Sequence, residues 1–268
     1  MSFSIAGKTA IVTGAANGVG LAIGRHFLRE GANVVFADID ESALEKELGE
    51  QAADENQPCR IFSGDLRERL TIANLLSFTV DAFERIDILV NGSRQILSGD
   101  PLCTEGDHVE ELLQQNLITS LRVSQATAKR MIKQADPDSE EPIGSIINLS
   151  SIAARRTHPE LLAYSVSTAA LDQLTRSLAV ALAPKRIRVN AVAFGSVMSA
   201  SLKGALQETD EVRDEIVDIT PLSRIAAPSE VSDAVQYLAS AASSFVTGQI
   251  ITVDGGRTLI DPVTNPAH

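Results

Sequence analysis

The sequence has no tryptophan, and aromatic residues make up only 4% of its 268 positions. Few rings are therefore available for stacking on nucleic-acid bases or on sugars. Cysteine is equally scarce, because Cys59 and Cys103 are the only two. Two cysteines in a chain of this length do not make the disulfide framework of a small secreted domain.

Basic residues are in deficit, because 23 Lys and Arg stand against 35 Asp and Glu, which gives a net charge of −12. Nucleic acids and anionic membranes both select basic surfaces, so the charge argues against either partner. No stretch reaches the roughly 18 apolar residues of a membrane span. The N-terminus lacks the basic start and apolar middle of a secretory signal. We therefore expect a cytoplasmic protein with reduced thiols, with neither nucleic acid nor membrane as a partner.

The sequence does contain a regular alternation of short apolar runs and longer helical patterns. Runs rich in Val and Ile predict strands at 8–13, 33–38, 59–64, 86–91, 145–150, 186–193 and 249–255. Helical patterns lie at 20–30, between the second strand and about residue 56, and near 68–84, 104–135, 161–183, 201–218 and 229–241. Nearly continuous hydrophobicity in the strands is typical of strands covered on both faces. The alternation predicts an α/β fold, a Rossmann-type doubly wound parallel sheet of about seven strands with helices on both faces.

A glycine-rich turn follows the first predicted strand directly. It reads TGAANGVG over residues 13–20, and a helical pattern follows at once. Glycines at such a turn let the backbone approach a pyrophosphate, which then lies on a helix N-terminus. A glycine-rich turn without a ligand is the alternative, but the strand before it and the helix after it favour a dinucleotide site.

Asp38 ends the second predicted strand, where a carboxylate accepts hydrogen bonds from the adenosine ribose of a dinucleotide. The same carboxylate would repel the 2′-phosphate of NADP, and no Arg or Lys occurs in the glycine turn or directly after Asp38. We therefore predict NAD as the cofactor. The alternative is that Asp38 caps the next helix, a role for which Asp40 competes.

Further motifs follow at intervals along the chain. Asp65-Leu66 comes after the third predicted strand, ILVN ends at Asn91, and Asn116 lies in the following long helix. Tyr164 follows Ser151 by thirteen residues. The segments VNAVAFGSVMS and VDGG stand near the C-terminal end. In combination these segments resemble the short-chain dehydrogenase/reductase family over nearly the whole chain, and the Ser-to-Tyr spacing matches Ser151 better than Ser150.

The resemblance implies hydride transfer between NAD and a carbinol or carbonyl carbon. Tyr164 would be the general acid/base, Ser151 would hydrogen-bond the reacting oxygen, and Asn116 would hold a water in the proton relay. The blander alternatives are a half-buried helical Tyr and a turn or capping Ser. The cofactor would contact Gly14, Asn17, Gly18, Val19, Gly20, Asp38, Ile39, Asp65, Leu66, Asn91, Tyr164, Thr168, Gly195, Val197 and Ser199.

The resemblance also implies a domain organisation and an assembly. One dinucleotide-binding domain would occupy residues 1–268, with an acidic surface loop at 135–142 and a polar tail at 258–268. A segment at about 196–222 would enclose a small alcohol or carbonyl substrate. The two long helices would join copies of the chain into a homodimer or homotetramer, although packing within one chain would give the same pattern. No metal is expected, because the four histidines show no metal-ligand spacing.

The chain departs from the family pattern around the nicotinamide. Thr168 stands where the family's Tyr-x-x-x-Lys motif has its lysine, on the helix face of Tyr164. A threonine hydroxyl keeps one hydrogen bond for the nicotinamide ribose, but it supplies no positive charge. Arg94 replaces the last glycine of the family's NNAG, and Phe194 replaces the proline before Gly195. Arg94 is a candidate for the space that the lysine ammonium leaves.

Two functions therefore stay open at this point. One is an NAD-dependent oxidoreductase with a modified set of catalytic residues, and the other is a catalytically weak or inactive NAD-binding relative with a regulatory or scaffold role. Arg155 and Arg156 follow the fifth predicted strand. They either bind a carboxylate or phosphate of the substrate or are solvated loop residues.

Overall fold

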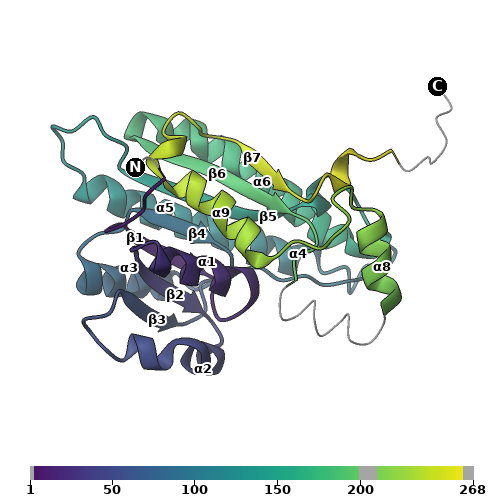
Figure 1. Cartoon of the computed structure of the whole chain (residues 1–268), viewed down its shortest axis with the longest axis horizontal. Helices are drawn as coiled ribbons and strands as arrows, with labels where there is room; N and C mark the ends of the chain where they lie inside the picture. The colour runs from purple at the N-terminus through teal and green to yellow at the C-terminus, as the bar shows by residue number, and fades with distance from the viewer. Residues whose placement is uncertain (1–2, 199–209, 262–268) are drawn as a thin grey trace.

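A computed structural model describes residues 3–198 and 210–261 of the chain. Seven parallel strands form one sheet in the order β3-β2-β1-β4-β5-β6-β7 (Figure 1). They are β1 (Thr9–Thr13), β2 (Asn33–Asp38), β3 (Cys59–Ser63), β4 (Ile88–Asn91), β5 (Gly144–Ser151), β6 (Ile187–Phe194) and β7 (Ile250–Val253). The chain runs outward from β1 in both directions, so the switch point, where such sheets bind ligands, lies between β1 and β4. The predicted fold class is confirmed.

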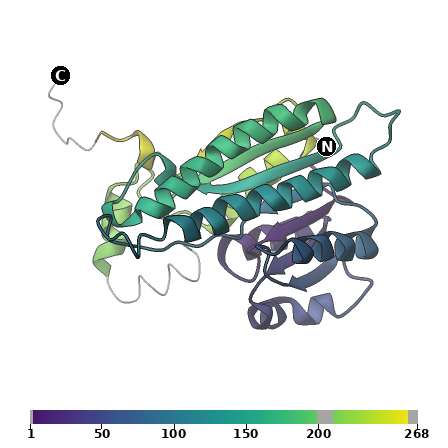
Figure 2. The same cartoon turned by 180° about the vertical axis from the view of Figure 1, so that it is seen from behind.

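Helices cover both faces of this sheet (Figures 1 and 2). They are α1 (Gly18–Arg29), α2 (Glu41–Ala52), α3 (Arg69–Phe83), α4 (Val109–Leu112), α5 (Thr119–Gln134), α6 (Leu162–Leu182), α8 (Asp210–Asp218) and α9 (Pro228–Ala239). Buried side chains of α1, α2 and α9 share one core with the sheet, and those of α3, α5 and α6 share the other. The two long helices α5 and α6 lie side by side across the face seen in Figure 2.

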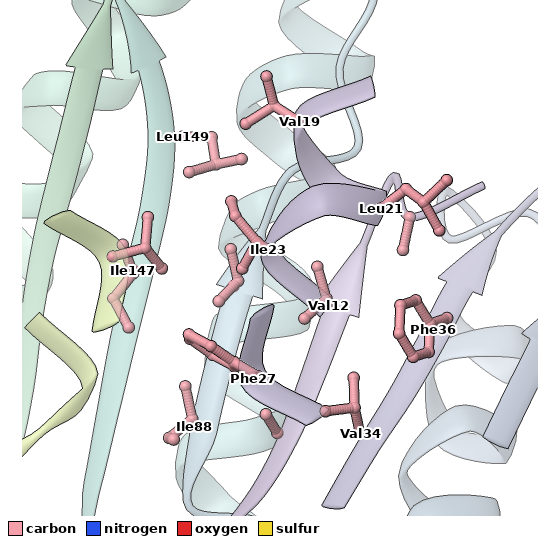
Figure 3. Close-up of a cluster of buried hydrophobic side chains, with 14 of the residues drawn as sticks. Val12, Val19, Leu21, Ile23, Phe27, Val34, Phe36, Ile88, Ile147 and Leu149 are labelled. Atoms are coloured by element: carbon pink, nitrogen blue, oxygen red, sulfur yellow. The ribbon is translucent and has the colours of Figure 1, made fainter. Parts of the chain in front are cut away.

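Neighbouring residues of a strand enter opposite cores because side chains alternate across a sheet. Val12 of β1 packs with Ile23 and Phe27 of α1 on one face (Figure 3), whereas Ile11 belongs to the cluster on the other face. Ile11 and Val12 are both fully buried. This two-sided burial explains why the strands read as continuous apolar runs.

One helical prediction differs from the structure, and a second is described only in part. The pattern at 104–135 is divided, because α4 begins at Val109 and a π-helical segment, Leu113–Ile118, separates it from α5. Such π-helical segments are rare interruptions of α-helices, and the continuous helical pattern of the sequence did not predict this one. The helix predicted at 201–218 is described only from Asp210 onward, since 199–209 lie outside the described residues.

The predicted acidic loop at 135–142 connects α5 to β5 without helix or strand. The polar tail is described as far as residue 261 and includes a short 3-10 turn, Arg257–Leu259. Within the described ranges, no helix is long and apolar enough to span a membrane.

Candidate functional site

A cleft of about 620 Å³ opens at the carboxyl ends of β1, β2 and β4. Seven of the predicted cofactor residues line it, namely Gly14, Asn17, Gly18, Val19, Gly20, Asp38 and Ile39. They come from the turn after β1, from the first residues of α1 and from the end of β2. The predicted adenosine half of the site is thus assembled in one place by the parallel order of the strands.

The glycines of this turn are required by close backbone approaches. Gly14 has φ +66°, and a Cβ there would lie 2.5 Å from the carbonyl oxygen of Gly92. A Cβ on Gly20 would collide with the carbonyl oxygen of Gly14. The N-cap residue of α1, Asn17, makes no side-chain hydrogen bond to this helix. The first N–H groups of α1 therefore face the cleft as a ready anion site.

The Asp38 carboxylate is held at the rim of the cleft by backbone groups. Its Oδ2 accepts the N–H of Ala16 at 3.0 Å, and its Oδ1 accepts the N–H of Asp40 at 3.1 Å. Asp40 is the residue that caps α2, because its Oδ1 accepts the N–H of Ala43 at 2.9 Å. Each Asp38 oxygen keeps a second lone pair for a ligand hydroxyl.

Asp65 and Leu66 lie next to the cleft lining rather than in it. Leu66 is buried in the core beside α3. The Asp65 carboxylate pairs with Arg67, with 2.6 Å between Nη2 and Oδ2, and this hydrogen bonding holds the pKa of Asp65 below its usual value. Arg67 itself lines the cleft, a contribution that sequence reasoning missed because no motif marks it.

The end of β4 is tied to the glycine turn and to the core. Thr13 Oγ1 accepts the N–H groups of Gly92 and Ser93 at 3.0 and 3.1 Å. The buried amide of Asn91 donates to Ser124 Oγ at 2.9 Å and to Asn148 Oδ1 at 2.8 Å. Asn91 therefore fixes β4 against β5 and α5, and this positions the segment that follows it.

At the end of β5 the two adjacent serines have different surroundings. Ser150 is fully buried, and its hydroxyl donates to Asp172 Oδ1 at 2.7 Å. Burial raises the pKa of the Asp172 carboxyl. Ser151 Oγ accepts the N–H of Ala153 at 3.1 Å, an acceptor bond that leaves the serine O–H free to donate. Of the two, Ser151 is the one suited to bind a substrate oxygen.

Tyr164 lies in the first turn of α6 and is only 3% exposed. Its ring packs in a small apolar cluster with Leu112 and Ala153. Nη1 of Arg94 donates to its hydroxyl at 3.1 Å. Thr168, one turn later, donates its own hydroxyl to the backbone carbonyl of Tyr164 at 2.8 Å. The threonine hydroxyl thus bonds its own helix, and a charged group reaches the tyrosine from another element.

Asn116 lies in the π-helical segment and is buried. Its side-chain oxygen accepts the N–H of Gln95 at 2.8 Å, and its amide donates to the Gln95 carbonyl at 3.0 Å and to Ser167 Oγ at 3.1 Å. Both amide hydrogens are therefore used by protein partners, which join the segment after β4 to α6.

The remaining predicted cofactor residues follow β6. The Gly195 N–H donates to the Val253 carbonyl at 3.2 Å, and Val197 forms a bridge with Ala226. Ser199 lies outside the described residues.

A second cavity, of about 630 Å³, has three arginines in its lining, Arg155, Arg224 and Arg257. Of these three, only Arg155 was a candidate from the sequence. Arg156, the other candidate, is not in the lining of this cavity and donates to the Thr258 carbonyl.

No cluster of His, Cys, Asp or Glu suited to a metal ion occurs in the part of the chain that the structure describes. The described residues of the site bring together a hydroxyl pair, a half-buried cation and a cleft with free helix N–H groups.

Comparison with known proteins places these features in context. A family model described as enoyl-(acyl carrier protein) reductase matches residues 14–258. An uncharacterized oxidoreductase of Mycobacterium tuberculosis (strain CDC 1551 / Oshkosh) is 33% identical over 256 residues, which cover 96% of this chain and 94% of that protein. The residues that the family model matches run from Gly14, the first glycine of the turn, to just beyond β7.

Solved structures give the same result. A 7 alpha-hydroxysteroid dehydrogenase complexed with NADH and 7-oxo glycochenodeoxycholic acid has a TM-score of 0.85 at 30% identity, covering 95% of this chain and 96% of that one. A gluconate 5-dehydrogenase from Burkholderia cenocepacia J2315 in complex with NADP and tartrate has a TM-score of 0.86 at 29% identity, covering 97% and 98%. Both neighbours are dehydrogenases, and they carry different nicotinamide cofactors.

Proposed function

We propose, because this chain belongs to the short-chain dehydrogenase/reductase family of oxidoreductases, that it interconverts an alcohol and a carbonyl by hydride transfer with NAD. The observation that carries the proposal is the cleft in which the glycine turn, the N-terminus of α1 and Asp38 meet. A dinucleotide needs these three groups together, for its pyrophosphate and for its adenosine ribose.

The residues of the cleft fit NAD better than NADP. The backbone bonds of Asp38 fix a negative charge where the adenosine ribose would lie, and this favours two free hydroxyls over a 2′-phosphate. Two arginines line the cleft: Arg67, whose guanidinium is paired with Asp65, and Arg94, whose guanidinium contacts Tyr164 and Phe194. The pairing with Asp65 reduces the positive charge that Arg67 could offer to a 2′-phosphate.

Bound NAD supplies a hydride acceptor and, when reduced, a hydride donor. The chain's own residues move the proton. Tyr164 would give its proton to a carbonyl oxygen in reduction and take one from a hydroxyl in oxidation. Ser151, whose O–H remains free to donate, would hydrogen-bond the same substrate oxygen and stabilise the charge that develops on it.

Replacing Asp38 by alanine tests the cofactor preference. A hydrogen bond to a charged acceptor contributes about 1.5–3 kcal/mol, so NADH affinity is expected to fall by about 10- to 100-fold. NADPH affinity changes less because the repulsion of its phosphate is removed, and the NADH-to-NADPH ratio falls. Titration of each reduced cofactor by its fluorescence measures both affinities.

Asp40→Ala is the matched control for this experiment. It removes the cap of α2, at a cost of about 1 kcal/mol in stability, and leaves the cleft carboxylate in place. The cofactor ratio of this variant should equal that of the wild type. A wild-type protein that prefers NADPH, or an Asp38→Ala variant with an unchanged ratio, would contradict the assignment of NAD.

The second candidate function is a catalytically weak or inactive NAD-binding protein with a regulatory or scaffold role. The position of Thr168 favours it, because a hydroxyl bonded to its own helix supplies no charge to the reaction. A panel of secondary alcohols and ketones, including a 7-hydroxysteroid and gluconate, separates the two. NADH binding without turnover, with activity created by Thr168→Lys, supports this second function.

We further propose that the chain assembles as a homodimer or homotetramer through α5 and α6. Large apolar side chains are exposed on these helices, with Val180 78%, Val166 44% and Ile132 41% exposed. Interfaces between protein chains commonly cover exposed apolar side chains. Light scattering of the purified protein should give a multiple of 28.5 kDa, and Val180→Asp should lower the observed mass. A monomeric wild type would exclude the assembly.

A further inference from the structure

We propose that Arg94 supplies the positive charge that faces the Tyr164 hydroxyl, in the role that the motif lysine has elsewhere in the family. Its Nη1 donates to Tyr164 Oη at 3.1 Å and to the Ser150 carbonyl at 3.3 Å. Its guanidinium carbon lies 4.3 Å from the centroid of the Phe194 ring. The inference rests on the proposed function for its catalytic meaning, but the contact itself does not depend on it.

Three departures from the family pattern meet at this point. Thr168 stands in place of the motif lysine, Arg94 in place of a glycine, and Phe194 in place of a proline. They are far apart in the sequence, yet the guanidinium of Arg94 contacts Tyr164 on one side and the ring of Phe194 on the other. A cation over an aromatic face is attracted to it, so Phe194 helps to hold the guanidinium in place.

The backbone on both sides of Arg94 is anchored. Before it, the Ser93 N–H donates to Thr13 Oγ1 at 3.1 Å, and Ser93 Oγ accepts from Gln115 at 3.0 Å. After it, the N–H and the carbonyl of Gln95 are both bonded to the Asn116 side chain. Asn116 therefore acts as a positioning residue for Arg94, and the side chain leaves the backbone in a defined direction.

Arg94 is the charged group that contacts the Tyr164 hydroxyl. The other side chains packed in the tyrosine's cluster are apolar. Among the charged groups on neighbouring elements, Asp172 is hydrogen-bonded to Ser150, and Glu110, Glu111 and Arg155 are exposed. None of the ion pairs within the described residues involves Arg94. Its charge is thus available to Tyr164.

The direction of the hydrogen bond suits proton transfer in both directions. The Arg94 N–H donates to a lone pair of the tyrosine oxygen, so the tyrosine O–H stays free for a substrate. In reduction the Tyr164 O–H bond breaks, its proton joins the substrate oxygen, and the electron pair remains on a phenolate that Arg94 stabilises. In oxidation that phenolate takes the alcohol proton, and the same O–H bond forms again.

The first test needs neither cofactor nor substrate. The chain has two tyrosines and no tryptophan, so Tyr237→Phe leaves Tyr164 as the only source of a tyrosinate absorbance band. In that background, Arg94→Met is expected to move the midpoint of the tyrosinate titration upward by about one to three pH units. Arg94→Lys, which keeps the charge, should restore most of the difference. A midpoint that Arg94→Met leaves unchanged would overturn the proposal.

The second test uses turnover. In Arg94→Met the rate of alcohol oxidation near neutral pH should fall about tenfold for each unit of that titration shift, and the alkaline rise of its pH profile should move with it. The NADH affinity should change little. A gain in NADH affinity would instead mean that the guanidinium occupies space needed by the nicotinamide, and this result would overturn the proposal.

Exchange of the two positions gives a third test. Thr168→Lys alone places two cations near one phenol, whereas Arg94→Gly combined with Thr168→Lys restores the family arrangement. The double variant should therefore be more active than Thr168→Lys alone, with strong coupling in the double-mutant cycle. Additive effects would contradict a shared role.

The outcomes separate the two proposals. A wild type without turnover removes the catalytic function and leaves the tyrosinate titration to decide on Arg94. A wild type with turnover and an unchanged titration in Arg94→Met keeps the function and removes the role of Arg94.

Discussion

Replacing Tyr164 by phenylalanine is expected to lower kcat by about 10²- to 10⁴-fold, the usual contribution of a positioned general acid/base. The ring is 3% exposed and packed among apolar side chains, and phenylalanine fills the same space. Only the hydroxyl is lost, with its hydrogen bond to Arg94. The free energy of unfolding should therefore change by no more than about 1 kcal/mol. Steady-state kinetics together with urea unfolding measure both quantities.

Tyr237→Phe is the matched control for this substitution. Tyr237 lies in α9, on the opposite face of the sheet from α6, where its ring contacts Phe3. The control should keep both kcat and NADH affinity at the wild-type values. If Tyr164→Phe keeps the wild-type turnover, the proton must come from another group, and the assigned role of Tyr164 is wrong.

Replacing Gly20 by alanine is expected to weaken NADH binding by about 10- to 100-fold, a change of about 1.4–2.8 kcal/mol. The added Cβ would collide with the carbonyl oxygen of Gly14, which belongs to backbone and has no rotamer to adopt. The turn and the first turn of α1 must then separate, and the N–H groups that would hold the pyrophosphate move apart. Overpacking of this kind also destabilises the fold by about 1–3 kcal/mol. Fluorescence titration and thermal unfolding test the two effects.

Gly106→Ala serves as the control for this variant. The nearest atom to a Cβ at Gly106 is the sulfur of Cys103 at 3.5 Å, an ordinary contact. This variant should bind NADH and unfold like the wild type. Normal NADH affinity in a folded Gly20→Ala protein would show that the cofactor does not lie on this turn.

The Arg94 contact changes how the missing lysine is understood. From sequence alone, Thr168 marks the loss of a charge, and the loss leaves an active and an inactive protein as the two alternatives. In the folded chain a different cation contacts the same hydroxyl, and Phe194 packs against that cation. The substitutions at these three positions are therefore consistent with relocation of the charge from α6 to the segment after β4.

The fold class and the adenosine half of the site were predictable because their signals are local. Each strand is a short apolar run, and each run needs only its own residues to be recognised. Gly14 directly follows β1, Gly20 lies in the first turn of the helix that comes next, and Asp38 ends β2. The carboxyl ends of parallel strands meet at one edge of a sheet, so these residues share one cleft.

Other features depend on groups that are distant in the sequence. The π-helical segment around Asn116 has no pattern of its own and is joined to the backbone of Gln95. Asp38 and Asp40 are equally plausible caps in sequence, and only the bond to Ala43 distinguishes them. The spacing to Tyr164 favours Ser151 over Ser150, but the bond that occupies the Ser150 hydroxyl comes from Asp172 in α6 and has no signal in the sequence.

The sequence by itself determined that this protein is a doubly wound α/β chain with a glycine-rich turn, an acidic residue at the end of β2 and a family motif without its lysine. Only the tertiary structure decided what stands near the tyrosine hydroxyl. Strands β4, β5 and β6 are neighbours in the sheet, so the segments at their carboxyl ends come together with α6. A side chain's charge acts over a few ångströms of space, and no spacing along the chain specifies that distance.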